Sequence, residues 1–270
     1  MDIPLPLDKL DVSSTSESKE KSYVVLVATG SFNPPTYMHL RLFELARDAL
    51  NLEGYTVIGA YLSPVNDAYK KKGLVSADHR IQMCQLACKS SDFIMVDTWE
   101  AKQVSYQRTL TILSRVKSFI CENSCVSAGK SFTSSTLNYK ALKFIDKCTF
   151  ISCDTNIFYT ESLRVMLVCG SDLLESFGVP GVWIPEQVRS ICRDFGVACI
   201  RREGQDVEKI ISSNDILNDN KRNIKIVDEL ISNQISSTRI RDCITRGLSV
   251  KYLTSDEVID YIQKQELYLH

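Results

Sequence analysis

The segment GSFNPPTYMH, residues 30–39, is the part of this chain that decides its fold. It follows the apolar run VVLVA at 24–28, which is typical of a buried parallel strand, and it precedes LRLFELAR at 40–47, where apolar residues recur at helical spacing. A strand, a glycine-containing turn and a helix in this order form a unit suited to binding phosphate. The glycine lets backbone approach a ligand closely, and the start of a helix presents free N–H groups to an anion. His39 lies in the first predicted helical turn, where its ring can donate a hydrogen bond to a phosphate oxygen.

Strands and helices are predicted to alternate along most of the chain. The predicted strands are 23–28, 55–61, 93–96, 165–169, 197–201 and 224–227. The predicted helices are 38–51, 77–90, 105–119, one that begins at Leu173, 185–195, 237–247 and 256–265, with Ser76 as an N-cap and Gly247 as a closing residue. This alternation indicates the α/β class: a Rossmann-like, doubly wound, mostly parallel sheet with helices on both faces. Ligands of such sheets bind beyond the carboxyl ends of the strands.

The composition is ordinary for a soluble globular protein: of 270 residues, 44% are hydrophobic and 24% are charged, and the net charge is −1. This balance gives no reason to expect a nucleic-acid partner, since such proteins carry a basic domain or stripe. No apolar run approaches the roughly 18 residues of a membrane span, and the acidic N-terminus does not resemble a secretory signal. The ten cysteines suggest neither a disulfide scaffold nor a zinc site, so reduced thiols and a cytoplasmic or nuclear location, or both, are expected.

A single domain is predicted over residues 22–270. Residues 1–21 are polar and contain Pro4, Pro6 and a Ser/Thr run, so we interpret them as a mobile N-terminal tail. Residues 120–161 are rich in Ser, Thr, Asn and Cys and show weak periodicity, and a loop of this length is uncommon inside a compact domain. We therefore expect a peripheral insertion there, with a short helix at 137–146 and a short strand at 149–153.

Two motifs resemble those of the nucleotidylyltransferase superfamily. Residues 36–39, TYMH, resemble its (His/Thr)-x-x-His signature, and residues 30–34, GSFNP, resemble the eukaryotic nicotinamide mononucleotide adenylyltransferase branch. Much later in the chain, ISSTRIR at 235–241 resembles the second signature, ISSTxxR. Met38 stands where the general pattern has glycine and Thr36 where it has its first histidine, as in other eukaryotic members. The resemblance extends over most of residues 23–110 and 164–268.

The resemblance implies adenylyl transfer from ATP to nicotinamide mononucleotide, and also to nicotinate mononucleotide, which forms NAD or deamido-NAD and pyrophosphate by direct in-line attack. ATP is then a co-substrate, Mg²⁺ arrives on its phosphates, and no protein metal site is expected. The expected partners are these small molecules, without nucleic acid or membrane, and a homo-oligomer stays open because the family forms several assemblies. Two alternatives also stay open: another nucleotidylyltransferase, such as a pantetheine-phosphate or glycerol-phosphate enzyme, or a non-catalytic nucleotide-binding or chaperone protein on this fold.

The phosphate of the mononucleotide is already a nucleophile, so catalysis requires positioning and charge neutralisation rather than a strong base. The resemblance assigns contact with the α-phosphate to His39. Lys71, in the basic run 70–72, aligns with a family substrate contact, and Arg241 is expected to reach the β- or γ-phosphate. Arg80 is a further candidate. The alternative for His39 is a helix-start histidine without a ligand. The alternative for Lys71 is that its basic run is simply solvated.

A second group of residues is assigned to substrate binding. Ser236, Ser237 and Thr238 at a predicted helix start form a phosphate cradle, although an ordinary N-cap would explain one hydroxyl. Trp99 and Trp183 are expected to stack on the nicotinamide ring, with a core position as the alternative. By resemblance, the remaining contacts come from Gly30, Ser31, Phe32, Thr36, Tyr69, Gly170, Asp172 and Val182.

Overall fold

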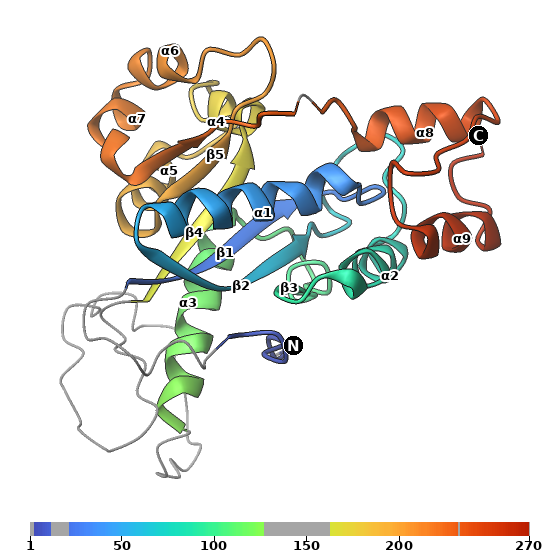
Figure 1. Ribbon diagram of the computed structural model, residues 1–270, viewed down its shortest axis with the longest axis horizontal. Coiled ribbons are helices and arrows are strands. Elements are labelled where there is room, and N and C mark those ends of the chain that lie inside the picture. Colours follow the sequence, from blue (N-terminus) through green and yellow to red (C-terminus); the bar gives the residue numbers. More distant parts are fainter. Residues whose placement is uncertain (1–2, 12–21, 127–162, 232, 270) are drawn as a thin grey trace.

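The computed structural model describes residues 3–11, 22–126, 163–231 and 233–269, and its centre is a six-stranded sheet (Figure 1). Every neighbouring pair of strands is parallel, in the order β3-β2-β1-β4-β5-β6. The strands are β1 (Ser22–Gly30), β2 (Tyr55–Pro64), β3 (Ile94–Val96), β4 (Leu163–Gly170), β5 (Val197–Ile200) and β6 (Ile224–Val227). This is the strand order of a doubly wound Rossmann sheet, so the predicted fold class is confirmed.

Helices make the connections between these strands: α1 (Tyr37–Leu52), α2 (Ala77–Ala87), α3 (Thr109–Val126), α4 (Ser171–Ser176), α5 (Pro185–Ser190), α6 (Val207–Ser212) and α7 (Asp215–Asp219). α8 (Ser237–Thr245) and α9 (Asp256–Lys264) follow the last strand. Short turns of other helix types lie at η2 (Cys88–Ser90), η3 (Ile191–Phe195) and η4 (Lys221–Asn223). Within the described ranges, no helix combines the length and the apolar character needed to cross a membrane. α2, α8 and α9 gather at one end of the molecule (Figure 1).

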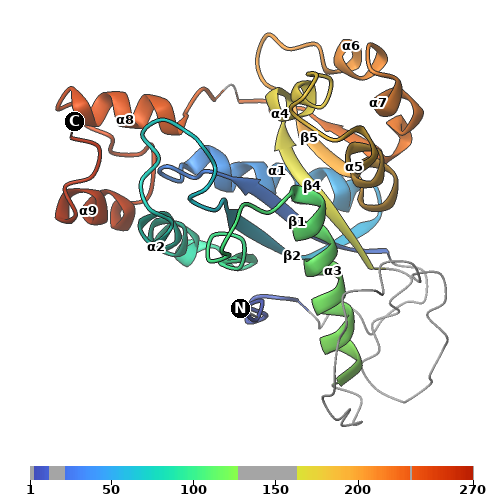
Figure 2. The ribbon, with the colours of Figure 1, turned by 180° about the vertical axis from the view of Figure 1, so that it is seen from behind.

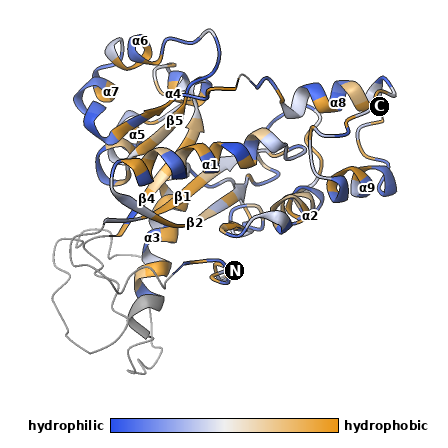
Figure 3. Ribbon diagram, viewed as in Figure 1, coloured by the Kyte–Doolittle hydropathy of each residue, from blue (hydrophilic) through white to orange (hydrophobic). Residues whose placement is uncertain are grey.

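The central strands bury side chains on both faces of the sheet. In β1, Val25 and Val27 join the hydrophobic cluster on the α3 side, whereas Val24 and Leu26 join the cluster on the α1 side. Figure 1 shows α1 across one face, and Figure 2 shows α3, α4 and α5 over the other. Figure 3 shows hydrophobic residues along the whole strands. Because successive side chains of a strand point to opposite faces, a continuous apolar run is what a core on both faces requires.

Most predicted elements are confirmed with small shifts in their bounds. The helix predicted over 77–90 consists of α2 and η2, and Ser76 occupies the N-cap position without a side-chain hydrogen bond to the helix. The helix predicted over 185–195 consists of α5 and the π-helical η3. Gly247 follows α8 with φ of +67°, which explains why glycine closes this helix. α6 and α7 are absent from the prediction because they span only six and five residues, although the side chains of Asp206 and Asn214 cap them.

The boundary of the predicted insertion at residue 120 is wrong. α3 begins at Thr109 rather than at residue 105 and continues to Val126. Ile120 is 2% exposed and belongs to the core cluster on this side of the sheet, so packing extends the helix beyond the point where the composition becomes polar. The helix predicted at 137–146 and the strand predicted at 149–153 lie outside the described residues.

Residues 3–11, which we call the N-terminal arm, pack against the sheet instead of belonging to a mobile tail. Leu5 is 3% exposed within the core cluster on the α3 side. The Tyr61 hydroxyl donates to the Pro6 carbonyl (2.7 Å), and the Asp11 N–H donates to the Ile58 carbonyl (2.8 Å). The polar composition of the arm conceals these contacts because they use two leucines, Leu5 and the partly buried Leu10, together with main-chain groups. Residues 12–21 of the predicted tail lie outside the described residues.

We expect Lys9 to be the polar residue that holds the arm most strongly. Its Nζ donates to the carbonyls of Cys88 and Ser91 (both 2.7 Å) and of Ile94 (3.1 Å). Lys9→Met is expected to lower the free energy of unfolding by about 1 to 3 kcal/mol, because three carbonyls lose a charged donor. The measurement is denaturant unfolding, with the exposed Lys89→Met as the control, expected within about 0.5 kcal/mol of wild type. Equal stability of the two variants would contradict this role.

Candidate active site at the carboxyl ends of β1 and β4

β1 and β4 are neighbours at the centre of the sheet, and the strand order runs outward from them in opposite directions. Ligands of open parallel sheets bind at such a switch point, outside the carboxyl ends of the strands. Here β1 ends at Gly30 and β4 ends at Gly170. The two predicted motif glycines therefore lie where the topology of the sheet itself favours a ligand.

His39 is the third residue of α1 and forms a capping box with Thr36. The Thr36 side chain accepts a hydrogen bond from the His39 N–H (3.4 Å), and the Thr36 N–H donates to Nδ1 of His39 (2.9 Å). A backbone N–H can only donate, so Nδ1 is the acceptor and the proton of the neutral ring lies on Nε2. The buried Thr36 thus sets the tautomer of His39. His39 itself occupies the third helical position, where a capping box usually has Glu or Gln. A direct contact of Thr36 with substrate stays a prediction.

The surroundings of His39 keep its ring neutral. Desolvation lowers the pKa of His39 to about 4, and the positive charges of Arg202 and Lys71 act in the same direction. The ring of Phe32 meets the imidazole edge to face, with 5.1 Å between the ring centroids. Phe32 is buried with φ of +43°, and a Cβ at Gly30 would lie 3.2 Å from its ring. Gly30 therefore makes room for the aromatic ring that packs on His39.

Lys71 and Arg241 bring positive charge to the turn that follows β1. Nζ of Lys71 donates to Ser31 Oγ (3.0 Å), and Nη1 of Arg241 donates to the Asn33 carbonyl (2.7 Å). Desolvation and the neighbouring charge of Arg241 lower the pKa of Lys71. The two cations are close enough for each to disfavour the positive charge of the other. Together with the Nε2–H of His39, they form surroundings that favour a bound anion.

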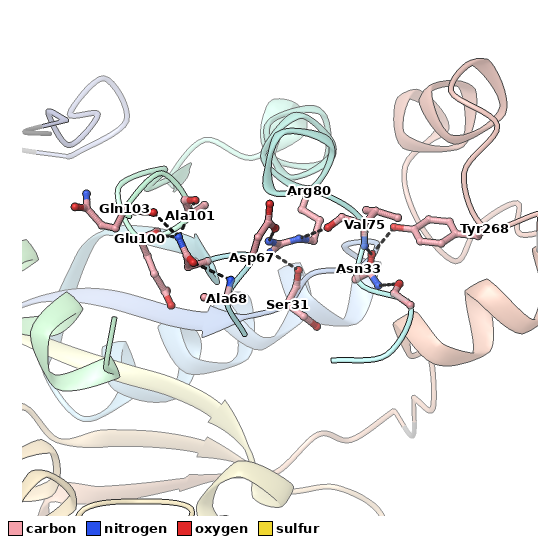
Figure 4. Close-up of polar contacts among 12 residues, drawn as sticks. Ser31, Asn33, Asp67, Ala68, Val75, Arg80, Glu100, Ala101, Gln103 and Tyr268 are labelled. Atoms are coloured by element: carbon pink, nitrogen blue, oxygen red, sulfur yellow. Dashed lines mark hydrogen bonds and ion pairs between the residues drawn. The ribbon is translucent and has the colours of Figure 1, made fainter. Parts of the chain in front are cut away.

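Asn33 organises the loop that carries Lys71, a role that the sequence analysis did not assign. Its side chain is 0% exposed, and its amide nitrogen donates to the Gly73 carbonyl (2.7 Å). Its amide oxygen accepts from the Val75 N–H (3.3 Å) and from the Tyr268 hydroxyl (2.8 Å) (Figure 4). In the sequence, an asparagine before two prolines indicates only a turn. Its partners at 73 and 268 are 40 and 235 positions away, so no local signal identifies them.

Arg80 supports the same loop and is not directed outward as a phosphate contact. Its side chain is 0% exposed. Nε donates to the Val75 carbonyl (2.9 Å), Nη1 to the Ser31 carbonyl (3.2 Å) and Nη2 to a carboxylate oxygen of Asp67 (2.8 Å) (Figure 4). All three nitrogens are thus engaged by the protein, and Arg80 fixes the 67–75 loop from the side of α2.

Arg202 lies beyond the ends of β4 and β5 and was not among the predicted site residues. Its Nε pairs with Oδ1 of Asp172 (3.1 Å), in the first turn of α4. A Cβ at Gly170 would lie 2.7 Å from Oδ1 of Asp172 and 2.9 Å from Nε of Arg202, so glycine lets this ion pair approach the strand end. The contribution of Arg202 to the pKa of His39 shows that the two halves of the site are electrostatically close. Its place directly after β5 is the signal that the sequence analysis passed over.

The three hydroxyl residues at the start of α8 have different local partners. Ser236 is the N-cap and accepts a hydrogen bond from the first turn of the helix. Ser237 Oγ donates to the Pro34 carbonyl (2.7 Å), and Thr238 Oγ1 accepts from Nη2 of Arg241 (3.4 Å). One hydroxyl is thus an ordinary cap and another ties α8 to the turn after β1. Phosphate contact stays a prediction, for which the first-turn N–H groups lack partners within the helix.

Trp99 and Trp183 are each held by their own neighbours. The guanidinium of Arg115 lies 5.0 Å from the Trp99 ring centroid. Nε1 of Trp183 donates to Ser176 Oγ (2.9 Å), and its ring meets Phe177 edge to face with 4.7 Å between centroids. Both tryptophans are half-buried against the cluster on the α3 side. Each is therefore partly a core side chain with an exposed part, and stacking on nicotinamide stays a prediction.

The segment that carries Trp99 is tied to the end of β2. The Asn66 amide nitrogen donates to the Gln103 carbonyl (2.6 Å; Figure 4). Ser63 Oγ donates to Oε2 of Glu100 (3.3 Å). Burial raises the pKa of Glu100 to about 8. The sequence analysis assigned no role to Asn66 or Glu100. Their hydrogen bonds join the end of β2 and the segment after it to the segment after β3, and such contacts between segments leave no local signal in the sequence.

Tyr69 and Val182, which the sequence analysis assigned to substrate, lie at the surface. Tyr69 stacks on Tyr106 with 6.0 Å between ring centroids. Val182 belongs to the connection between α4 and α5, next to Trp183. Both are exposed and are therefore open to a ligand.

The fold and these side chains define the class of protein: an α/β protein with cationic side chains and helix N-termini gathered at the switch point of its sheet, surroundings that favour an anion. A model of the cytidylyltransferase-like family matches residues 27–243. The fold is similar to that of a solved structure described as Plasmodium falciparum nicotinic acid mononucleotide adenylyltransferase complexed with NaAD. The TM-score is 0.58 at 17% identity, over 91% of this chain and 97% of that one. At this identity the likeness supports the fold.

Closer relatives in sequence cover nearly the whole chain. An Arabidopsis thaliana protein named nicotinamide/nicotinic acid mononucleotide adenylyltransferase is 58% identical over 268 residues, which are 99% of this chain and 98% of the relative. A Bos taurus protein named nicotinamide/nicotinic acid mononucleotide adenylyltransferase 1 is 44% identical over 256 residues, 93% of this chain and 91% of the relative. The chain therefore belongs to the cytidylyltransferase-like family and, within it, to the nicotinamide/nicotinic acid mononucleotide adenylyltransferases.

We expect His39 to make the stability of the protein depend on pH. In the unfolded chain the imidazole takes up a proton near its usual pKa of about 6.5, whereas in the folded protein it does so only near 4. The stability that this group contributes is present above pH 6.5 and is lost as the pH falls toward 4, by about 2 to 3 kcal/mol.

The matched variant is His39→Gln, because glutamine is a usual capping-box residue and does not titrate. The measurement is the difference in unfolding free energy between wild type and variant from pH 7.5 down to pH 4.5. We expect this difference to shift against the wild type as the pH falls. A difference that stays constant over this range would contradict the prediction.

Proposed function

We propose that this chain transfers the adenylyl group of ATP to nicotinamide mononucleotide and to nicotinic acid mononucleotide, with release of pyrophosphate. The observation that carries the proposal is the arrangement around His39. A neutral imidazole, with Nδ1 occupied by the capping box and its proton on Nε2, stands at the start of α1 within the electrostatic influence of Lys71 and Arg202. The identities of 58% and 44% to relatives named for this activity support the same reaction.

The reaction requires little covalent participation by the protein. An oxygen of the mononucleotide phosphate attacks the α-phosphorus of ATP, and a new P–O bond forms as the bond to pyrophosphate breaks. The attacking phosphate is already anionic, so no side chain needs to remove a proton. Negative charge develops on the α-phosphate oxygens and on the leaving pyrophosphate, and stabilising it in a fixed geometry is the main task.

The cations and donors of the site fit this task. His39 donates from Nε2 to the α-phosphate, and its low pKa keeps the ring neutral throughout the reaction. Lys71 and Arg241 neutralise the β- and γ-phosphates. Both are already held against the turn after β1, by Ser31 and Asn33, and each keeps further N–H donors for a ligand. Because these groups are placed before substrate binds, little reorganisation is needed during the reaction.

Mg²⁺ enters this proposal as part of the bound nucleotide. Within the described part of the chain, no three His, Cys, Asp or Glu side chains gather to hold a metal ion. Mg²⁺ commonly keeps water and phosphate ligands rather than an all-protein cage. Bound to ATP, the ion would supply further positive charge to the phosphates, beside Lys71 and Arg241.

For the nicotinamide ring we propose Trp99 and Trp183. An electron-poor pyridinium stacks well on indole, and each tryptophan has a buried part that fixes the ring and an exposed part that can receive a ligand. At the end of β4 and in the first turn of α4, Gly170 and Asp172 are proposed to contact the adenosine.

Pyrophosphate release in the presence of ATP, Mg²⁺ and either mononucleotide is the direct test. The wild-type protein is expected to turn over both mononucleotides. His39→Gln is expected to lower kcat by about 100-fold or more, because it removes one preorganised donor from the developing charge. Binding of both nucleotides by the wild type without pyrophosphate release would instead favour the non-catalytic alternative.

Lys71 and Lys70 offer a matched pair for the phosphate contact. Lys71→Ala is expected to raise the KM for ATP and to lower kcat/KM by about 10- to 100-fold, because a charge-assisted contact to phosphate is lost. Lys70→Ala removes the same charge from the preceding, exposed residue, and its kinetic constants are expected to stay within about twofold of wild type. Equal losses in the two variants would show that only general positive charge matters.

A further inference from the structure

The residues after α9 return toward the candidate site. α9 ends at Lys264, and residues 265–269 form a segment that we call the C-terminal hook. Within it, Glu266 and Tyr268 have left-handed backbone conformations, with φ of +51° and +66°. Residues with a Cβ adopt this conformation rarely, and it persists where surrounding contacts hold it. Leu267 supplies such a contact, because it is buried in the hydrophobic cluster with Met83 of α2.

Tyr268 carries the hook to the turn after β1. Thr245 Oγ1, at the end of α8, lies within hydrogen-bond distance of the Tyr268 carbonyl (3.1 Å) and of the Arg241 carbonyl (3.0 Å), and its one proton is shared between these two acceptors. The Tyr268 hydroxyl donates to Oδ1 of Asn33 (2.8 Å), which Figure 4 shows beside the contact from Val75. Desolvation raises the pKa of Tyr268, so the hydroxyl keeps its proton and acts as a donor.

Asn33 transmits this contact to the loop that bears Lys71. Its amide is held at both ends, since the nitrogen donates to Gly73 and the oxygen accepts from Val75 and Tyr268. Of the two bonds to the oxygen, the one from Tyr268 is shorter, 2.8 Å against 3.3 Å. Gly73 lies between Lys71 and Val75 and adopts φ of +70°, which glycine does readily, so the bonds from Asn33 to Gly73 and Val75 are what tie this loop to the turn after β1.

We propose that Tyr268 is a positioning residue for ATP: its hydroxyl orients the Asn33 amide, which holds residues 73–75 and thereby keeps Lys71 beside Ser31. The proposal rests on the proposed adenylyl transfer, in which Lys71 contacts a phosphate of ATP. Tyr268 has no contact with substrate in this scheme and acts only through Asn33. The C-terminal hook is thus a part of the nucleotide site that lies in neither signature motif.

The variant that tests this is Tyr268→Phe, which keeps the ring and removes only the hydroxyl. We expect the KM for ATP and the Kd for ATP from titration calorimetry to rise about three- to tenfold, with kcat within about twofold of wild type. The matched control is Tyr261→Phe. It removes a hydroxyl that bonds Nδ1 of His79 (2.9 Å) between α9 and α2, without contact to Asn33. This control is expected to keep the ATP constants of wild type.

A second comparison separates positioning from a general structural role. In a Lys71→Ala background, adding Tyr268→Phe is expected to change the Kd for ATP by less than about twofold, because the side chain that it positions is already absent. A structural role would give additive losses and would lower the thermal midpoint of Tyr268→Phe well below that of Tyr261→Phe. If Tyr268→Phe does not fold, Thr245→Val removes the donor to the Tyr268 carbonyl and is expected to raise the same constants.

Three results would overturn the proposal: wild-type ATP constants in Tyr268→Phe, equal effects of Tyr268→Phe and Tyr261→Phe, or additivity with Lys71→Ala. Failure of the proposed function would look different, since the wild type itself would then release no pyrophosphate. In that case the Kd for ATP still tests the role of Tyr268. A higher Kd in Tyr268→Phe than in the wild type would support positioning of a nucleotide-binding lysine, and an equal Kd would contradict it.

Discussion

The buried amide of Asn33 is the interaction on which the arrangement of the candidate site depends. Its side chain bonds the 73–75 loop and the C-terminal hook, and its carbonyl accepts from Arg241 of α8. Each buried polar group without a partner costs about 1 to 3 kcal/mol. The folded state is therefore favoured when all these segments meet at the Asn33 amide and satisfy it. Parts of the chain that are far apart in sequence are thereby held in one arrangement around the turn after β1.

The second constraint is electrostatic. Lys71 and Arg202 both disfavour a proton on His39, and desolvation acts more strongly in the same direction. A histidine in such surroundings serves as a neutral hydrogen-bond donor, and the capping box with Thr36 decides which nitrogen donates. An incoming phosphate would find a neutral donor and several cations, a combination that stabilises developing negative charge without a proton transfer.

The fold was predictable because its signals are local. The apolar runs of the strands are continuous where both faces are buried, and the helices repeat their apolar residues at a regular spacing. α6 and α7 were missed because six and five residues are too few for a helical repeat of apolar residues to be recognised. The N-terminal arm was missed because its attachment depends on Lys9 and on main-chain groups, whose partners at 58, 61 and 88–94 cannot be read from the arm itself.

The sequence by itself determined the order of strands and helices, the two motifs at 30–39 and 235–241, and hence the reaction class, because a motif is a local pattern of residue types. Only the tertiary structure decided which of the polar side chains are engaged by other parts of the protein. Arg80 and Ser237 resemble phosphate contacts in the sequence, yet both are engaged by main-chain carbonyls. Arg202 and Tyr268 lie outside both motifs, and Asn33 indicates only a turn within its motif, yet these residues meet at the site or hold it together. The physical reason is that a polar side chain takes its role from the partner that satisfies it, and these partners come together only when the chain folds.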